Sequence, residues 1–127
     1  IKWGCDARVS CMTPDLVRAM DAANCYDLSF GIEAGVQRLL NNVRKGTSIP
    51  LIRKAIDVVK KNSDIRIGGL FILGLPGETY ESFIAGIDTL LDAGQHEHIN
   101  VYLCQLLPNS NQPPFEYKLY YFARIIE

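Results

Sequence analysis

Long apolar runs, basic clusters and secretion signals are all absent from this sequence of 127 residues. No apolar stretch approaches the roughly 20 residues that a membrane-spanning helix needs, and nothing resembles a signal peptide. Basic residues number 13 against 14 acidic ones, and no basic run is longer than Lys60-Lys61. The chain therefore lacks the electrostatic footprint of nucleic-acid binding, and we expect a cytoplasmic protein with no membrane or nucleic-acid partner.

Cysteine pairs of the kind that bind metals are also missing. The four cysteines, Cys5, Cys11, Cys25 and Cys104, match no zinc-site spacing, and no two of them form a Cys-x-x-Cys pair. Four cysteines could form two disulfides. The apolar fraction is nevertheless large, at 48%, and no secretory signal is seen. We therefore expect buried, reduced thiols in a reducing compartment.

The length and composition are those of one domain, which we place over residues 1–127. The sequence opens at Ile1, without a methionine, inside a segment that is expected to be a strand. We therefore expect the chain to be a piece of a longer protein.

Strand and helix patterns alternate along the chain. Apolar runs and alternating apolar residues predict strands over 2–8, 26–33, 65–75 and 98–107. Apolar residues on one helix face, with Thr13 and Thr79 as N-caps, predict helices over 13–24, 36–43, 49–61 and 79–93. This alternation predicts an α/β fold with a parallel sheet, open or curled into part of a barrel.

The carboxyl ends of the strands are the places to look for a binding site, because parallel α/β folds bind their ligands there. In this sequence those ends lie at or just after Arg8, Glu33, Leu73 and Leu106. Polar or unusual residues at these four positions are therefore the candidates.

The stretch "GLPGET", residues 74–79, ends the most apolar strand abruptly. A phosphate-binding loop is disfavoured, because the stretch has no Lys or Arg and carries Glu78, and the Gly-x-Gly-x-x-Gly pattern is absent. Two interpretations remain. One is a tight turn in which Gly74 and Gly77 adopt unusual backbone angles and Glu78 starts the helix. The other is a close approach of the backbone to a flat apolar ligand.

Glu33 ends the second predicted strand, and a long connection separates it from the helix expected over 49–61. The Glu33 carboxylate could accept hydrogen bonds from the hydroxyls of a sugar, and Lys45 could pair with a carboxylate. The alternative is that Glu33 caps the short helix and that Lys45 is simply solvated.

Two segments carry a family resemblance: "FGIEAGVQRLLNNVRKG" and "GGLFILGLPGETYESF". In this order they resemble the radical S-adenosylmethionine superfamily. The opening "DAR" with its Thr-Pro-Asp helix is also similar, and "LLPNSNQPPFEY" is similar to a segment of members that carry a cobalamin domain. Methylthiotransferase-like members are among the similar sequences. The resemblance covers nearly all of residues 1–117.

The resemblance implies a (β/α)6 partial barrel, of which this chain supplies about four strands. It also implies two cofactors, S-adenosylmethionine and a [4Fe–4S] cluster, and in some relatives cobalamin as a third. One-electron reduction at the cluster cleaves S-adenosylmethionine to a 5′-deoxyadenosyl radical, which abstracts hydrogen from the substrate.

The resemblance also implies which residues contact S-adenosylmethionine. Glu33 would hydrogen-bond the ribose hydroxyls and Lys45 would hold the methionyl carboxylate. Arg8 would point toward the same cavity.

Apolar and backbone contacts follow from the same resemblance. Leu73 and Gly74 would lie against the adenine, and Leu106 would add an apolar contact. Glu78 would be a turn and capping residue rather than a ligand.

Two departures from the family pattern stand out. Ala34 occupies a position where relatives usually carry Ser, and the Cys-x3-Cys-x2-Cys loop that holds the cluster is absent. We therefore expect the carboxyl-terminal half of a radical enzyme, inactive until joined to an amino-terminal half of the same protein that holds the cluster.

The substrate is not readable from this sequence, so a small molecule, a peptide and an RNA all remain open. Two alternatives to the radical enzyme also remain. One is a non-catalytic, degenerate half-barrel that binds a nucleotide-like ligand or a protein partner. The other is an unrelated α/β enzyme.

Overall fold

The computed structural model describes residues 1–92 and 98–104, in which strands and helices alternate. The strands are β1 (Trp3–Ala7), β2 (Cys25–Glu33), β3 (Arg66–Leu73) and β4 (His98–Leu103). The helices are η1 (Val9–Cys11), α1 (Pro14–Ala22), α2 (Gln37–Asn42), α3 (Ile49–Asn62) and α4 (Tyr80–Asp92). Each strand and helix predicted within the described part is present.

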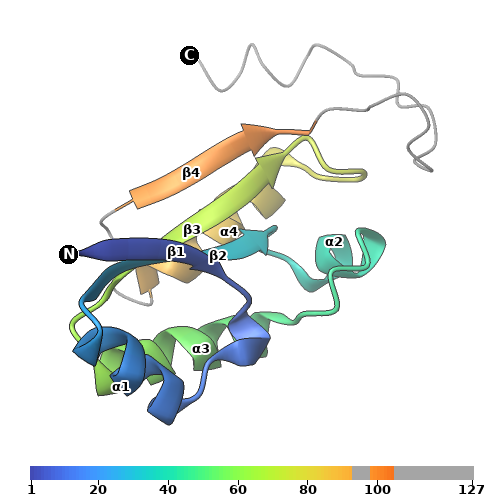
Figure 1. Cartoon of the computed structure of the whole chain (residues 1–127). Helices are drawn as coiled ribbons and strands as arrows, with labels where there is room; N and C mark the ends of the chain where they lie inside the picture. The colour runs from blue at the N-terminus through green and yellow to red at the C-terminus, as the bar shows by residue number, and fades with distance from the viewer. Residues whose placement is uncertain (93–97, 105–127) are drawn as a thin grey trace.

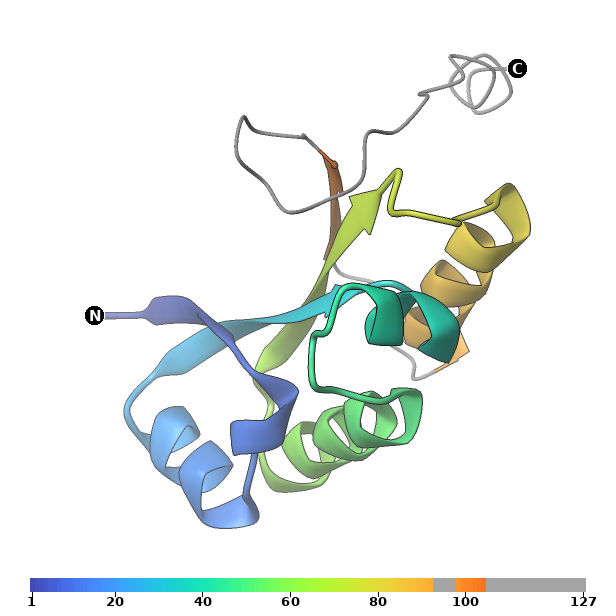
Figure 2. The same cartoon turned by 90° about the vertical axis from the view of Figure 1, so that its right-hand side faces the viewer.

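The described strands form one parallel sheet in the order β1-β2-β3-β4. Helices α1, α3 and α4 cover one face of this sheet, and no described element covers the other face (Figures 1 and 2). Strands that neighbour each other in chain order form the wall of a barrel, whereas a doubly wound sheet reverses its order. The predicted α/β fold, a partial parallel barrel, is confirmed.

The core lies between the sheet and the three helices. Leu28, Phe30 and Ile32 alternate along β2 and are fully buried on the helix side. From β3, Phe71 meets Phe83 of α4 edge to face, with the ring centroids 6.4 Å apart. Helix α3 contributes the inward face that its apolar spacing predicts, namely Ile52, Ala55, Ile56 and Val59.

Side-chain caps fix where the helices under the sheet begin, and the Thr79 hydroxyl caps α4 by accepting from the Ser82 N–H at 3.2 Å. The Thr13 hydroxyl accepts a hydrogen bond from the Leu16 N–H at 3.2 Å, ahead of Pro14. The Ser48 hydroxyl accepts one from the Leu51 N–H at 3.3 Å and starts α3. Each cap satisfies a backbone donor that the first turn of a helix leaves unpaired.

The uncovered face of the sheet is polar at the amino ends of its inner strands. Asp27 of β2 accepts a hydrogen bond from Arg66 of β3 at 3.3 Å. His98 of β4 lies with Nε2 3.2 Å from the Ser29 hydroxyl and 3.7 Å from the Asp27 carboxylate. These contacts tie three neighbouring strands together from the side opposite the helices.

None of the four cysteines forms a disulfide, which agrees with the prediction of reduced thiols, but only Cys25 is buried. Burial raises the pKa of the Cys25 thiol, which therefore stays protonated and unreactive. Cys11 is exposed, because η1 lies at the surface. In the part of the chain that the structure describes, no helix combines the length and apolarity that crossing a membrane requires.

Candidate cofactor site

The end of β2 is held in an unusual backbone conformation. Glu33 has a φ of 64°, in the left-handed region that residues other than glycine rarely adopt. The Ala34 N–H donates to the Ile32 carbonyl at 2.8 Å and closes a three-residue turn around Glu33. The pairing of β2 with β3 also shifts register between Gly31 and Glu33. Strain of this kind concentrates at functional sites, and here it accompanies a carboxylate whose Oε1 atom lies close to Gly31 of the same strand.

The Glu33 carboxylate forms an ion pair with Lys45, which lies in the connection between α2 and α3. The Lys45 ammonium donates to Glu33 Oε1, and the two side chains are 32% and 16% exposed, respectively. Positive φ angles at Arg44 and Gly46 turn the chain on either side of Lys45 and bring it back over β2. The structure thus brings together the two polar residues that the sequence singled out.

The alternative role for Glu33, as the cap of the short helix, is not what the structure shows. The N-cap of α2 is Val36, and no side chain caps that helix. Lys45 is likewise half-buried and paired rather than simply solvated.

Gly31 makes room for this ion pair, although it was not among the candidate residues predicted from the sequence. A Cβ at Gly31 would lie 3.1 Å from both Glu33 Oε1 and Lys45 Nζ. A glycine in the middle of a strand is the available signal, because it marks a place where other groups approach closely.

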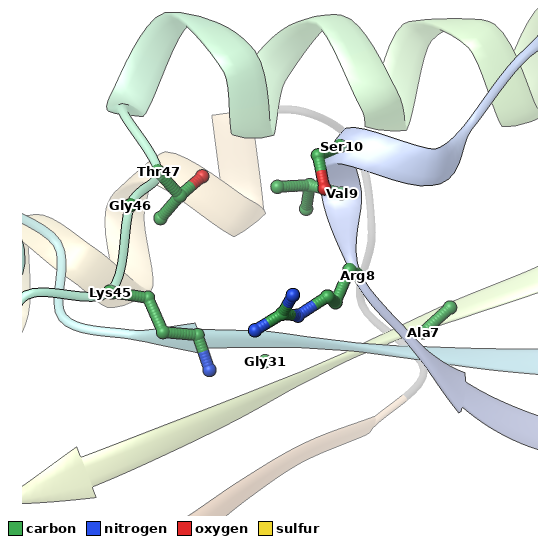
Figure 3. A pocket seen from close by; sticks show the side chains of 8 residues that line it. All are labelled: Ala7, Arg8, Val9, Ser10, Gly31, Lys45, Gly46 and Thr47. Carbon is green, nitrogen blue, oxygen red and sulfur yellow. The ribbon is translucent and has the colours of Figure 1, made fainter.

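Arg8 and Lys45 line one pocket, between the end of β1 and the connection from α2 to α3. Figure 3 shows both side chains reaching into the space beside Gly31, which forms the floor of the pocket. The other lining residues are Ala7, Val9, Ser10, Gly46 and Thr47. Two cationic side chains around one space give a site that favours an anion such as a carboxylate.

The turn after β3 is organised around Glu78. Its carboxylate accepts hydrogen bonds from the N–H groups of Gly74, at 2.6 Å, and Leu75, at 3.3 Å. Gly74 and Gly77 have φ angles of 93° and 75°, which explains the two glycines. The predicted turn is therefore confirmed, and Glu78 acts as a turn residue.

Helix α2 connects this turn to the Glu33 end of the sheet. Arg38 donates to the Gly77 carbonyl at 2.9 Å, and Asn42 donates to the Pro76 carbonyl at 3.5 Å. The two polar contacts hold the loops after β2 and β3 in a fixed relation at one edge of the sheet. Leu73 and Gly74 lie half-buried at that edge. Leu106 lies outside the described residues.

Glu78 leads to a first prediction, on stability. Burial raises the pKa of the Glu78 carboxyl above its ordinary value of 4.5, although hydrogen bonds from Gly74 and Leu75 oppose the shift. The folded chain then holds this proton to higher pH than the unfolded chain. We therefore expect this carboxyl to lower the free energy of unfolding as the pH rises from about 4 to about 7.

Urea unfolding across that pH range measures the effect. Glu78→Gln keeps an oxygen acceptor for the turn and removes the titration, so the Glu78 part of the pH slope should disappear. Glu78→Ala leaves two N–H groups without their acceptor and should lower the free energy of unfolding by about 1–3 kcal/mol. Identical pH slopes in wild type and Glu78→Gln would contradict this account.

The described residues do not hold a metal centre. No three His, Cys, Asp or Glu side chains in residues 1–92 and 98–104 are grouped so that they could bind a metal ion. The four cysteines are at positions 5, 11, 25 and 104, and their spacing does not match the three-cysteine loop that binds a cluster. The residues present therefore do not fit a [4Fe–4S] cluster.

Comparisons with known proteins show which proteins this chain is similar to in sequence. A scan against models of protein families matched none of them. A methyltransferase acting on 2-(S-pantetheinyl)-carbapenam-3-carboxylate, from Streptantibioticus cattleyicolor, is 32% identical over 124 residues. That match takes in 83% of this chain and 18% of the relative. The cobalamin-dependent radical SAM methyltransferase TokK, from Streptomyces tokunonensis, is 56% identical over 39 residues, or 31% of this chain and 6% of TokK.

Solved structures agree on the fold. The radical SAM enzyme HemN, a coproporphyrinogen III oxidase from Escherichia coli, superposes with a TM-score of 0.76 at 16% identity. That superposition covers 98% of this chain and 31% of HemN. The radical SAM methyltransferase TsrM from Kitasatospora setae gives a TM-score of 0.67 at 17% identity, over 80% of this chain and 20% of TsrM.

The chain is thus similar in sequence to a radical SAM methyltransferase over a short stretch, and it shares its fold with radical SAM enzymes. The two relatives are both methyltransferases by name. The matched region is 18% of the length of the carbapenam methyltransferase and 6% of the length of TokK, so the chain corresponds to a small part of each. TsrM was solved with cobalamin and a [4Fe–4S] cluster, and in a second structure with an analogue of S-adenosylmethionine.

Proposed function

We propose that this chain binds S-adenosylmethionine at the carboxyl edge of its sheet, as part of a radical enzyme. The observation that carries the proposal is the Glu33–Lys45 pair, held at the end of β2 by a left-handed turn beside a pocket that also contains Arg8. In this proposal Glu33 accepts hydrogen bonds from the ribose hydroxyls. Lys45, with Arg8, holds the methionyl carboxylate.

The chemistry of these side chains suits that ligand. S-adenosylmethionine offers hydroxyl donors and a carboxylate acceptor, and the site offers a carboxylate acceptor next to two cationic donors. The Lys45 side chain is 32% exposed, so a ligand can reach the pair from solvent. An ammonium has three donors, so Lys45 can keep its contact with Glu33 while it binds the ligand carboxylate.

The turn after β3 suits an adenine better than a phosphate. The N–H groups of Gly74 and Leu75 already donate to Glu78, so they are not free to bind phosphate oxygens. Gly74 has no side chain, which lets a flat ring approach the backbone at this point. We assign Leu73 and Gly74 to the adenine, with Leu106 as a further apolar contact.

In this proposal another part of the protein binds the [4Fe–4S] cluster, because the described residues do not fit a cluster. We infer that an amino-terminal half of the same protein provides three thiolates. When the cluster and S-adenosylmethionine are both bound, they supply one-electron cleavage of the sulfonium. The role of this chain is to bind and orient the nucleoside and the carboxylate.

The reaction that we favour is methyl transfer. Two relatives are methyltransferases by name, and one of them is cobalamin-dependent. We therefore propose cobalamin as a further cofactor of the complete protein. A small molecule, a peptide and an RNA all remain candidates for the methyl acceptor.

A pair of lysine variants tests the binding proposal. In the chain joined to its cluster-binding half, Lys45→Met should weaken S-adenosylmethionine binding about 10- to 100-fold, because a charge-assisted hydrogen bond is lost. Lys60→Met, which removes an exposed charge from the last turn of α3, should leave the affinity unchanged. Isothermal titration calorimetry gives both dissociation constants. Equal affinities for the two variants, or no binding by the wild type, would overturn the proposal.

A further inference from the structure

Helix α2 contacts both of the loops that the proposed function assigns to the nucleoside. Figure 1 shows α2 beyond the carboxyl end of β2, on the side of the sheet where β3 also ends. Its residues Leu39 and Leu40 are fully buried, so the helix is fixed to the core of the domain. Because protein interiors are close-packed, a helix anchored in this way is a rigid support for the loops that contact it.

Helix α2 fixes the position of Glu33 through Lys45. The Lys45 N–H donates to the Leu40 carbonyl at 3.2 Å, in the turn that ends the helix. The Lys45 ammonium in turn forms the ion pair with Glu33. The carboxylate at the end of β2 is thereby tied to α2.

The turn after β3 is tied to the same helix through Arg38. The Arg38 guanidinium donates to the Gly77 carbonyl at 2.9 Å, and a Cβ at Gly77 would lie 2.8 Å from Nη1 of Arg38. Gly77 therefore leaves room for the guanidinium. Inside the turn, Glu78 accepts hydrogen bonds from the N–H groups of Gly74 and Leu75. Gly74 therefore keeps its position relative to Gly77.

The hydrogen bond from Arg38 lies at the surface of the domain. The Arg38 side chain is exposed, unlike the two leucines that follow it. A hydrogen bond made at the surface contributes little to global stability, because water can replace either partner. The contact nevertheless joins loops that are 39 positions apart in the sequence. Its effect should therefore appear in the relative position of the two loops rather than in the stability of the fold.

The relative position of the loops matters to a ligand that touches both of them. When a ligand makes one contact, its second group is held near the second site, and the gain in affinity depends on the spacing of the two sites. A nucleoside has fixed dimensions, so it gains most when Glu33 and Gly74 are already held at the matching distance. A ligand that touches one loop gains nothing from this spacing.

We propose that Arg38 is a positioning residue, which holds the turn after β3 at the distance from Glu33 that lets one nucleoside contact both loops. This inference rests on the proposed function, because the ribose and the adenine are assigned above to Glu33 and Gly74. Arg38 does not line the pocket, and it acts on the ligand through the turn. It determines whether the ribose and the adenine can be bound at the same time.

Two ligands that differ by the adenine test the inference, in the chain joined to its cluster-binding half. S-adenosylhomocysteine carries the adenine, the ribose and the amino-acid group, and S-ribosylhomocysteine has a hydroxyl in place of the adenine. The variants are Arg38→Met, which removes the donors, and Arg38→Lys, which keeps an ammonium donor. The matched control, Arg53→Met, removes the same charge from an exposed position on α3. Titration calorimetry gives each dissociation constant, and S-adenosylmethionine is titrated into the wild type as well.

Arg38→Met should weaken the binding of S-adenosylhomocysteine about tenfold and leave the binding of S-ribosylhomocysteine unchanged, because only the first ligand touches both loops. Arg38→Lys should bind both ligands as the wild type does, since an ammonium can donate to the same carbonyl. Arg53→Met should also bind both ligands as the wild type does. The midpoint of thermal unfolding without ligand should be the same in all four proteins.

Other results would overturn the inference. If the wild type binds S-adenosylmethionine and Arg38→Met weakens both ligands equally, or weakens neither, Arg38 does not position the turn, and the proposed function stands without it. The same conclusion follows if S-ribosylhomocysteine does not bind the wild type, or if Arg53→Met has the same effect as Arg38→Met. A lower unfolding midpoint in Arg38→Met would assign Arg38 a structural role instead. If the wild type does not bind S-adenosylmethionine, the proposed function and the role of Arg38 fail together.

Discussion

Exchanging the charges of Glu33 and Lys45 in one variant, E33K with K45E, is expected to abolish S-adenosylmethionine binding and to preserve the fold. The exchanged pair can still form an ion pair, so the loops after β2 and α2 remain held together. The ligand then meets charges of the wrong sign: a lysine at the ribose hydroxyls and a glutamate at the carboxylate. Losing two charge-assisted contacts should weaken binding at least about 100-fold.

This exchange separates a structural role of the pair from a binding role. Circular dichroism and the unfolding midpoint report on the fold, and calorimetry reports on the ligand. The matched control exchanges Asp57 and Lys61, an exposed pair on α3 with 4.0 Å between its charged atoms. That control should bind like the wild type, because exposed pairs contribute little and lie away from the site. Binding by the Glu33–Lys45 exchange at wild-type affinity would show that the pair is only structural.

Gly35→Ala is expected to cause the largest loss of stability among single substitutions in the loop after β2. A Cβ at Gly35 would lie 1.8 Å from the Cα and 2.1 Å from the N of Gly86, in the backbone of α4. The clash is with main chain, so no rotamer change relieves it, and α4 must move away from the sheet. That movement would disturb the contact between Phe71 and Phe83. We expect the free energy of unfolding to fall by about 3 kcal/mol, as measured by urea denaturation.

Gly46→Ala is the matched control for this prediction. Gly46 has a φ of 67°, but a Cβ there would meet nothing within 4 Å. Alanine should therefore cost only the strain of a Cβ in the left-handed conformation, which is about 1 kcal/mol. Gly35 is not among the described glycines at positive φ, so a loss no larger than that of Gly46→Ala would contradict the predicted clash with α4.

Much of the fold could be predicted from local patterns. The inward stripe of α3 follows from apolar spacing, and the predicted caps Thr13 and Thr79 accept from backbone donors that every helix start leaves open. The alternation of strands and helices was enough to predict a parallel sheet. Burial of individual cysteines was not predictable in this way, and the prediction was wrong for Cys11, because exposure depends on where η1 lies on the surface.

The candidate site was predictable in part. Glu33 and Lys45 stood out because a strand ends on a carboxylate and a long connection follows, and the structure joins them in one ion pair. Gly31 did not stand out, because its importance depends on what packs against it. The contact between Arg38 and Gly77 joins loops that are far apart in the sequence, so no local pattern reports it. The roles of Arg8, Leu73, Gly74 and Leu106 stay predictions.

Reductive cleavage of S-adenosylmethionine is the measurement that tests the central claim most directly. The chain is joined to its cluster-binding half, reconstituted with iron and sulfide without oxygen, and assayed for 5′-deoxyadenosine. We predict that the wild type releases 5′-deoxyadenosine and that the Glu33–Lys45 exchange forms the same cluster but releases almost none. Equal release by the two proteins, or a cluster that forms in the wild type without any cleavage, would contradict the claim that this edge of the sheet binds S-adenosylmethionine for catalysis.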